Sequence, residues 1–229
     1  MFSCRAIMLF LLPVWMQLAA CAQERPYEQS QTFTQMNQAQ ANTTAATEKR
    51  LDTATFGTGC FWCTEAQFTQ LRGVERVESG YSGGTVPNPT YKQVCTGTTG
   101  HAEVVQITYD PAVITYDELL AAFWAAHDPT QLNRQGNDIG TQYRSVIFYH
   151  NEAQKQKAET YKQRLNEEHA YDKPVVTEIT PFPAFYKAED YHQDYYELNG
   201  HEPYCSMVVR PKVEKFKKVF KDKLKEPQQ

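Results

Sequence analysis

The sequence predicts a mixed α/β (α+β) domain built on one β-sheet with helices packed against it. Short runs of β-branched and aromatic residues alternate with helical stretches, and prolines or glycines separate them. Hydrophobic residues make up 41% of the 229 residues, enough to bury a core. This length suggests one domain with additional segments, or at most two small domains.

The first half of the predicted domain contains mainly strands. Two prolines make the segment 85–91 a predicted loop. Glycines, or Asp110-Pro111, end the β-like runs. We predict strands at 53–59, 74–81 and 102–110, and a helix at 63–71.

The second half contains two helices whose starts can be read directly. Thr115 and Glu118 have the spacing of a capping box and predict a helix from Thr115 to Ala126. Asn151 is a favourable N-cap for a helix that ends near Glu168. The remaining predictions are strands at 145–149 and 174–179, a polar loop at 127–143, a Pro- and aromatic-rich stretch at 181–205 and a lysine-rich helix at about 213–224. Together these elements predict a ferredoxin-like two-layer sandwich with one mixed sheet.

The N-terminal residues predict export and a lipid anchor. Arg5 precedes an apolar run that is too short for a comfortable transmembrane helix. The run ends in Leu18-Ala19-Ala20-Cys21, which resembles the bacterial lipoprotein box and implies lipid on Cys21; an ordinary signal peptide cut nearby is the alternative. We therefore expect an extracytoplasmic, membrane-anchored bacterial lipoprotein that faces the periplasm.

These observations divide the chain into four parts. Residues 1–20 are the predicted lipoprotein signal peptide, and residues 21–52, rich in Gln, Thr, Ala and Asn, are a predicted lipidated, disordered tether. The catalytic domain is predicted at 53–225, with a tail at 226–229. A net charge of −4 gives no case for nucleic-acid binding, and we expect a monomer.

The stretch "GTGCFWCTE" (57–65) carries the most chemical information. Cys60 follows a predicted strand and starts a helix, where free N–H groups and a partial positive charge favour a thiolate. Three interpretations compete for Cys60 and Cys63. A zinc site lacks a second ligand pair of suitable spacing. A thioredoxin-like redox pair fits the placement, but the bulky Phe61 and Trp62 suggest instead a nucleophile beside an apolar wall.

Further motifs favour the nucleophile. "GCFWC" is followed in order by "SGYSGG", "NPTY", "VCTGTTGHAEVVQI", "FWAAHDPTQLNRQGNDIGTQYRS" and "AEDYHQDYY". This series closely resembles the A-type peptide methionine sulfoxide reductases over about Phe56 to Lys212. The resemblance implies an oxidoreductase that reduces methionine S-sulfoxide, free or in oxidised proteins, with no bound cofactor and no metal. It also implies a thioredoxin-like protein or another dithiol as reductant.

The resemblance assigns roles to particular residues. Cys60 is expected to attack the sulfoxide sulfur and to become a sulfenic acid, which condenses with a thiol to a disulfide. Glu103 is expected to donate the proton, provided burial raises its pKa. Tyr91 and Tyr143 are the implied hydrogen-bond donors to the sulfoxide oxygen. Phe61 and Trp62 are the implied walls for the S-methyl group. Asp138 is implied as a further residue of the substrate pocket, and His192 as a supporting residue near it.

Two cysteines are candidates for the resolving thiol. Cys205 of "HEPYC" lies in a Pro- and Gly-flanked stretch that we expect to be mobile enough to reach Cys60, so we favour it over Cys63, whose bond on a helix risks strain. Cys95 is expected to be structural, and the lysine run 212–225 a solvated helix face. There are two alternative functions. One is a disulfide oxidoreductase that acts through Cys60 and Cys63, and the other is a non-catalytic binder of oxidised methionine.

Overall fold

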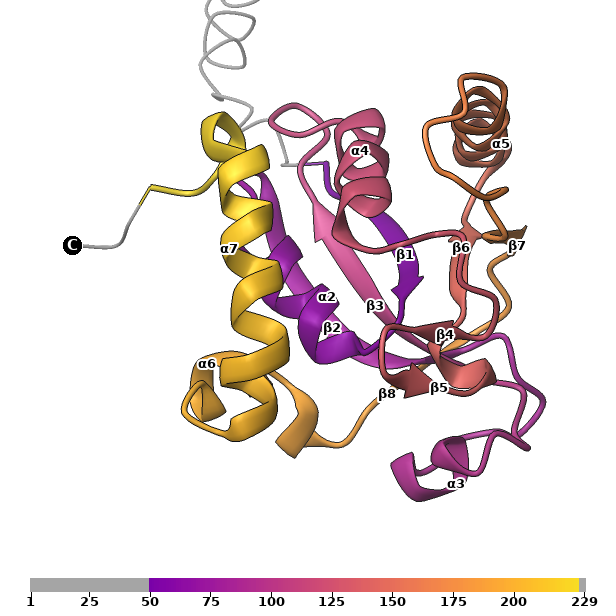
Figure 1. Cartoon of the computed structure of the whole chain (residues 1–229), viewed down its shortest axis with the longest axis vertical. Coiled ribbons are helices and arrows are strands. Elements are labelled where there is room, and N and C mark those ends of the chain that lie inside the picture. Colours follow the sequence, from indigo (N-terminus) through magenta and orange to yellow (C-terminus); the bar gives the residue numbers. More distant parts are fainter. Residues whose placement is uncertain (1–49, 227–229) are drawn as a thin grey trace, which may run out of the picture. The chain divides into compact units, whose positions relative to one another are not determined.

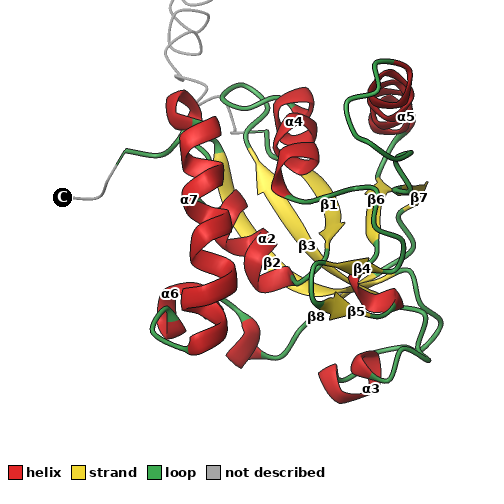
Figure 2. Cartoon of the chain, viewed as in Figure 1, coloured by secondary structure: helices red, strands yellow, loops and turns green. Residues whose placement is uncertain are grey.

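A six-stranded mixed sheet lies at the centre of the structure (Figures 1 and 2). The computed structural model describes residues 50–226. The strand order is β7-β6-β1-β3-β2-β8, and only the β6–β7 pair of this sheet is parallel. The strands are β1 (Asp52–Thr58), β2 (Val74–Ser82), β3 (Ala102–Tyr109), β6 (Ser145–Tyr149), β7 (Glu178–Pro181) and β8 (Phe185–Lys187).

The chain order around the four central strands is that of a ferredoxin-like fold. Helix α2 (Phe61–Phe68) connects β1 to β2, and α4 (Tyr116–Ala126) connects β3 to β6. The resulting β-α-β-β-α-β unit has the spatial order β6-β1-β3-β2, with antiparallel neighbours. Helix α7 (Arg210–Val219) packs on α2, and α5 (Glu152–Glu167) packs beside β6 and β7 (Figure 1). The predicted fold class is therefore confirmed.

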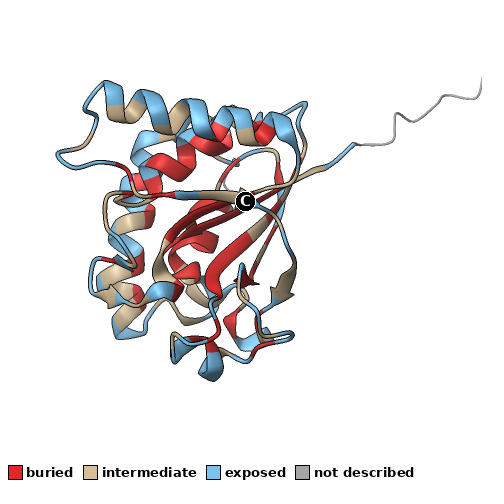
Figure 3. Ribbon diagram, turned by 90° about the vertical axis from the view of Figure 1, so that its right-hand side faces the viewer, coloured by how far each residue is buried: buried red, intermediate tan, exposed pale blue. Residues whose placement is uncertain are grey.

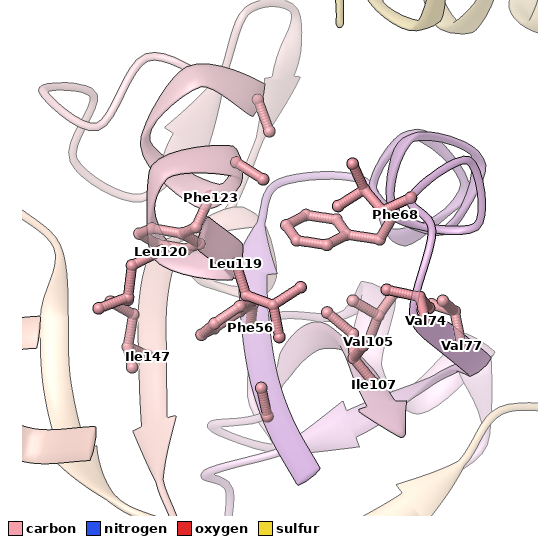
Figure 4. Close-up of a cluster of buried hydrophobic side chains, with 14 of the residues drawn as sticks. Phe56, Phe68, Val74, Val77, Val105, Ile107, Leu119, Leu120, Phe123 and Ile147 are labelled. Carbon is pink, nitrogen blue, oxygen red and sulfur yellow. The ribbon is translucent and has the colours of Figure 1, made fainter. Parts of the chain in front are cut away.

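The main core fills the space between the sheet and helices α2 and α4 (Figure 4). The ring of Phe56 on β1 lies 5.8 Å from the ring of Phe68 on α2 and 5.1 Å from that of Phe123 on α4. Val105 and Ile107 of β3 face the same layer. Burying side chains of this size stabilises the fold by about 1.5–3 kcal/mol each. The buried residues accordingly gather on the sheet and on the inner sides of the helices (Figure 3).

Both predicted helix caps form. The hydroxyl of Thr115 accepts a hydrogen bond from the N–H of Glu118, and the Glu118 carboxylate accepts one from the N–H of Thr115. The Asn151 side chain accepts a hydrogen bond of 2.9 Å from the N–H of Gln154. The predicted starts of α4 and α5 are therefore confirmed.

Several predicted boundaries are wrong. The predicted loop 127–143 contains a small hairpin, β4 (Arg134–Gln135) and β5 (Asp138–Ile139). The strand predicted at 174–179 starts only at Glu178, because the N–H groups of Val175 and Val176 bond to the Asn166 side chain and the Pro129 carbonyl. Helices α3 (Tyr91–Cys95) and α6 (Tyr195–Asn199) were not predicted, and the C-terminal helix α7 occupies 210–219 rather than 213–224.

The predicted signal peptide, Cys21 and nearly all of the predicted tether lie outside the described residues. Asp52, assigned to the tether, is the first residue of β1. Within residues 50–226, the helices are too short or too polar to cross a membrane.

The capping box gives a test of the fold. Replacing Thr115 by Ala removes the side-chain acceptor and should lower the free energy of unfolding by about 1 kcal/mol, measured by urea denaturation. Thr115→Ser keeps a hydroxyl and should lose much less. Equal losses in the two variants would contradict a role for the hydroxyl.

Candidate active site

Two glycines allow β1 to lead into α2 next to the central strand β3. A Cβ on Gly57 would lie 2.9 Å from the carbonyl oxygen of Glu103. Gly59 has a φ of +105°, a left-handed conformation that favours glycine. The chain then starts α2 with Cys60 as its N-cap residue. Cys60 is thereby held at the edge of a cavity of about 190 Å³.

This cavity brings the predicted site residues together. Cys60, Phe61 and Trp62 come from the start of α2, and Glu103 comes from β3. The other lining residues come from α3, β5, the 3₁₀ turn Thr141–Tyr143 and the segment before α7: they are Tyr91, Asp138, Tyr143 and Tyr204. Seven of the eight were predicted from the sequence; Tyr204 was not.

Glu103 is buried at the base of the site. Its Oε2 atom accepts a hydrogen bond of 3.0 Å from the backbone N–H of Phe61, at the N-terminus of α2. Burial raises the pKa of its carboxyl well above the usual range, and the nearby Cys60 raises it further. A carboxyl group in this environment stays protonated at higher pH and can donate a proton to a bound molecule.

Tyr91 and Tyr143 remain hydrogen-bond donors. Burial, followed by the charge of Glu103, raises the pKa of both phenols above the usual range. The backbone N–H of Tyr91 is itself held by a 2.9 Å hydrogen bond to Glu189, which also accepts from the hydroxyl of Tyr81. The two phenols line the same cavity as the Cys60 thiol.

The aromatic wall is fixed by the segment between β8 and α6. The indole N–H of Trp62 donates to Nδ1 of His192 over 3.1 Å. The Trp62 ring stacks on Tyr195, with ring centroids 3.8 Å apart. His192 also lies 5.1 Å from the Phe61 ring. His192 therefore supports both walls, in the position expected for it.

Tyr204 closes the cavity opposite the sheet. Its hydroxyl donates a 2.9 Å hydrogen bond to Oδ2 of Asp138, and its ring meets Trp62 edge-on at 5.7 Å. Its hydroxyl also lies close to the thiol of Cys60. The sequence offers one clue to Tyr204, which directly precedes the predicted resolving residue Cys205.

The three cysteines expected to act in the reaction lie in one buried cluster. Cys60, Cys63 and Cys205 pack with Val209 and Val213. Cys205 is fully buried and begins a π-helical turn, Cys205–Val209, that continues into α7. The sequence did not predict this helical turn, and the mobility expected for the stretch stays a prediction. Cys95, expected to be structural, is exposed, and its thiol hydrogen-bonds the Tyr91 side chain.

The electrostatics of the cysteines differ from the expectation for a helix N-terminus. Burial raises the pKa of the Cys60 thiol well above its usual range, and the adjacent Cys63 raises it further. The pKa of Cys63 is lowered, first by a hydrogen bond from Cys60 and also by Lys212. The surroundings therefore disfavour the thiolate of Cys60 and favour that of Cys63. The helix N–H that was expected to favour a Cys60 thiolate is bonded to Glu103 instead.

Glu65 is a buried carboxyl that was not predicted from the sequence. It lies on α2, and its Oε1 atom has no hydrogen-bond partner among the described residues. Burial raises the pKa of Glu65 to about 7, while the backbone N–H groups of Asp194 and Tyr195 act in the opposite direction. Glu65 thus faces the start of α6, the helix that carries the stacking partner of Trp62.

Within residues 50–226, no group of three or more His, Cys, Asp or Glu side chains is arranged to hold a metal ion.

The chain is similar in sequence to a family model and to known proteins. The family model "Peptide methionine sulfoxide reductase" matches residues 52–224. The peptide methionine sulfoxide reductase MsrA of Saccharolobus solfataricus is 58% identical over 175 residues, which are 76% of this chain and 98% of that protein. The enzyme of the same name from Acinetobacter baumannii strain AYE is 57% identical over 172 residues, covering 75% and 98%.

Two solved structures are also similar. Methionine sulfoxide reductase A of Corynebacterium diphtheriae has a TM-score of 0.59 and 41% identity, covering 65% of this chain and 75% of that chain. The reduced form of Mxr1 from Saccharomyces cerevisiae has a TM-score of 0.62 and 36% identity, covering 69% and 91%.

The Glu65 carboxyl makes stability depend on pH. Between pH 4.5 and about 7, the folded state keeps a proton that the unfolded state has lost, so the free energy of unfolding should fall as pH rises. Glu65→Gln has no titratable group at this position. The fall in the free energy of unfolding over this pH range, up to about 3 kcal/mol in the wild type, should therefore be absent from the variant in urea denaturation. Glu214→Gln, an exposed control on α7, should follow the wild type. Parallel curves for wild type and Glu65→Gln would contradict the prediction.

Proposed function

We propose that Cys60 carries the activity of this chain, which belongs to the peptide methionine sulfoxide reductase family. The chain is a peptide-methionine (S)-S-oxide reductase, an oxidoreductase that reduces methionine sulfoxide to methionine. One observation supports the assignment of this chemistry to residues: a single cavity is lined by a thiol, a buried carboxyl with a raised pKa, phenol donors and an aromatic wall.

The cavity suits a sulfoxide. The S-methyl group of the substrate fits against Phe61 and Trp62, because methyl and sulfur groups make favourable contacts with aromatic rings. The sulfoxide oxygen then faces the donors on the other side. Tyr91 and Tyr143 stabilise the negative charge that develops on this oxygen, as the donors of an oxyanion hole do.

Glu103 supplies the proton. Cys60 loses its thiol proton and attacks the sulfoxide sulfur, while Glu103 protonates the oxygen. The substrate S–O bond breaks, the hydroxyl group passes to the Cys60 sulfur to give a sulfenic acid, and methionine is released; the proton lost by the thiol balances the one that Glu103 donates. When Glu103 gives up its proton, its carboxylate is left buried. The N–H of Phe61 already points at this carboxylate from a helix N-terminus, which stabilises the anion.

A second thiol and an external reductant complete the cycle. Cys63 and Cys205 both pack in the cluster that contains Cys60, and condensation of either with the sulfenic acid gives a disulfide and water. A thioredoxin-like dithiol protein then reduces the disulfide by thiol–disulfide exchange. The substrates are methionine sulfoxide residues in oxidised proteins, or the free amino acid.

The proposed location is the extracytoplasmic side of a membrane. The support is the N-terminal sequence, with one charge, a short apolar run and Leu18-Ala19-Ala20-Cys21. A lipid on Cys21 would tether the domain to the membrane through residues 22–51 without a spanning helix.

Replacing Glu103 by Gln tests the acid. Activity should depend on the protonated carboxyl, so wild-type single-turnover rates should fall as pH rises through its raised pKa. At neutral pH, Glu103→Gln should form methionine about 100-fold more slowly or worse, with a flat pH profile. Cys60→Ser should form none, and Glu159→Gln, an exposed control, should match the wild type. Methionine formation at the wild-type rate in Glu103→Gln would remove Glu103 from the mechanism, and activity in Cys60→Ser would remove Cys60.

The anchor has a separate test. Radioactive palmitate supplied to bacteria that express the full chain should label the wild-type protein. Cys21→Ser should abolish the label and release the protein from membranes into the soluble fraction, whereas Cys4→Ser should leave both unchanged. Labelling that persists in Cys21→Ser would contradict the anchor.

A further inference from the structure

The ammonium group of Lys212 lies beside the sulfur of Cys63. Lys212 is in the first turn of α7, and its Nζ atom is 3.7 Å from the Cys63 Sγ. The residue is half-buried, rather than part of the solvated lysine face expected from the sequence. Among the described residues, this sulfur is the only hydrogen-bond partner of the Lys212 ammonium.

This contact places a positive charge next to a buried sulfur. Cys63 is only 3% exposed, so little water is available to stabilise an anion there. The hydrogen bond from the Cys60 thiol to this sulfur lowers the pKa of Cys63 most, and the Lys212 ammonium in contact with the sulfur lowers it further. Burial and the nearby Asp138 act in the opposite direction.

The other charged and titratable groups around the pair come from several elements. Asp138 and Tyr204 face the cysteine pair from β5 and from the segment before α7. His127, at the end of α4, lies close enough for Lys212 to lower its pKa, and burial keeps that histidine neutral above about pH 4. Lys212 is therefore the cation that faces Cys63.

Cys205 lacks such an arrangement. Burial raises the pKa of its thiol, and the nearby Cys60 raises it further. Its nearest cationic influence, Arg210, donates a hydrogen bond to the Gly200 carbonyl. Cys205 also starts the π-helical turn, so it would have to leave a helical backbone to reach a new partner.

We infer that the Lys212 ammonium group favours the thiolate of Cys63, which makes Cys63 the thiol that first captures the Cys60 sulfenic acid. Lys212 is then a positioning residue for disulfide formation. This inference rests on the proposed function of Cys60 and reverses the preference for Cys205 drawn from the sequence.

The step is balanced without any further oxidant. The Cys63 thiolate attacks the Cys60 sulfur, an S–S bond forms, and the S–O bond breaks with its electron pair on oxygen. The hydroxide takes a proton and leaves as water. Cys63 is oxidised, and the Cys60 sulfur is reduced from the sulfenic to the disulfide level.

The test is a disulfide map of the full chain after a pulse of methionine sulfoxide without reductant. Samples are quenched at intervals, free thiols are alkylated, sulfenic acid is trapped with dimedone, and the products are identified by mass spectrometry. Wild-type protein should form Cys60–Cys63 first, and Cys205→Ser should form it at the same rate. A first product of Cys60–Cys205 in the wild type would overturn the inference.

Lys212→Met isolates the role of the charge. At neutral pH it should yield the same one equivalent of methionine, but form the disulfide about tenfold more slowly, with the pH dependence of that step moved to higher pH. Lys212→Arg should restore most of the rate, and Lys217→Met, an exposed control on the same helix, should behave like the wild type. An unchanged rate and pH profile in Lys212→Met would overturn the inference. The methionine yield also shows whether each variant is folded, and no methionine from the wild type would instead refute the proposed function.

Discussion

The hydrogen bond from the Phe61 amide to the Glu103 carboxylate ties the start of α2 to the central strand of the sheet. The remaining geometry of the site depends on it. The bond requires β1, β3 and α2 to approach closely, which the lack of a side chain at Gly57 permits. It sets the acid beneath the nucleophile and points both into one cavity. The cost of burying this carboxyl is offset because burial favours its neutral form and the helix N-terminus stabilises the anion when the group ionises.

The opposite wall of the site is supplied by the C-terminal third of the chain. His192, Tyr195 and Tyr204 all contact Trp62, and Tyr204 also reaches Asp138 on the small hairpin. The pocket therefore joins residues more than a hundred positions apart, and its shape depends on how the segment from β8 to α7 lies over α2. At this junction Lys212 places a positive charge beside Cys63, and the buried Glu65 faces the start of α6.

Local signals in the sequence predicted much of this structure. The capping residues Thr115 and Asn151 fixed helix starts because their hydrogen bonds involve residues three positions away. The hairpin β4–β5 and helix α3 were missed because each is only two to five residues long and carries no hydrophobic period. The pocket residues were found through motifs of a resembling family. Lys212 and Glu65 could not be found, because a lysine in a lysine run and a glutamate between Thr64 and Gln67 look solvent-exposed until tertiary packing buries them.

The two edges of the sheet bear on how such an enzyme handles damaged proteins. Strand β7 has four residues, ends in Pro181 and carries an ion pair between Glu178 and Arg144; strand β8 has three residues and ends in Lys187. Oxidised proteins often expose extended segments that pair with any open strand. Short edges with proline and charge resist such pairing. The fold can thus admit one side chain of a client into its pocket while offering the client's backbone little open strand edge to pair with.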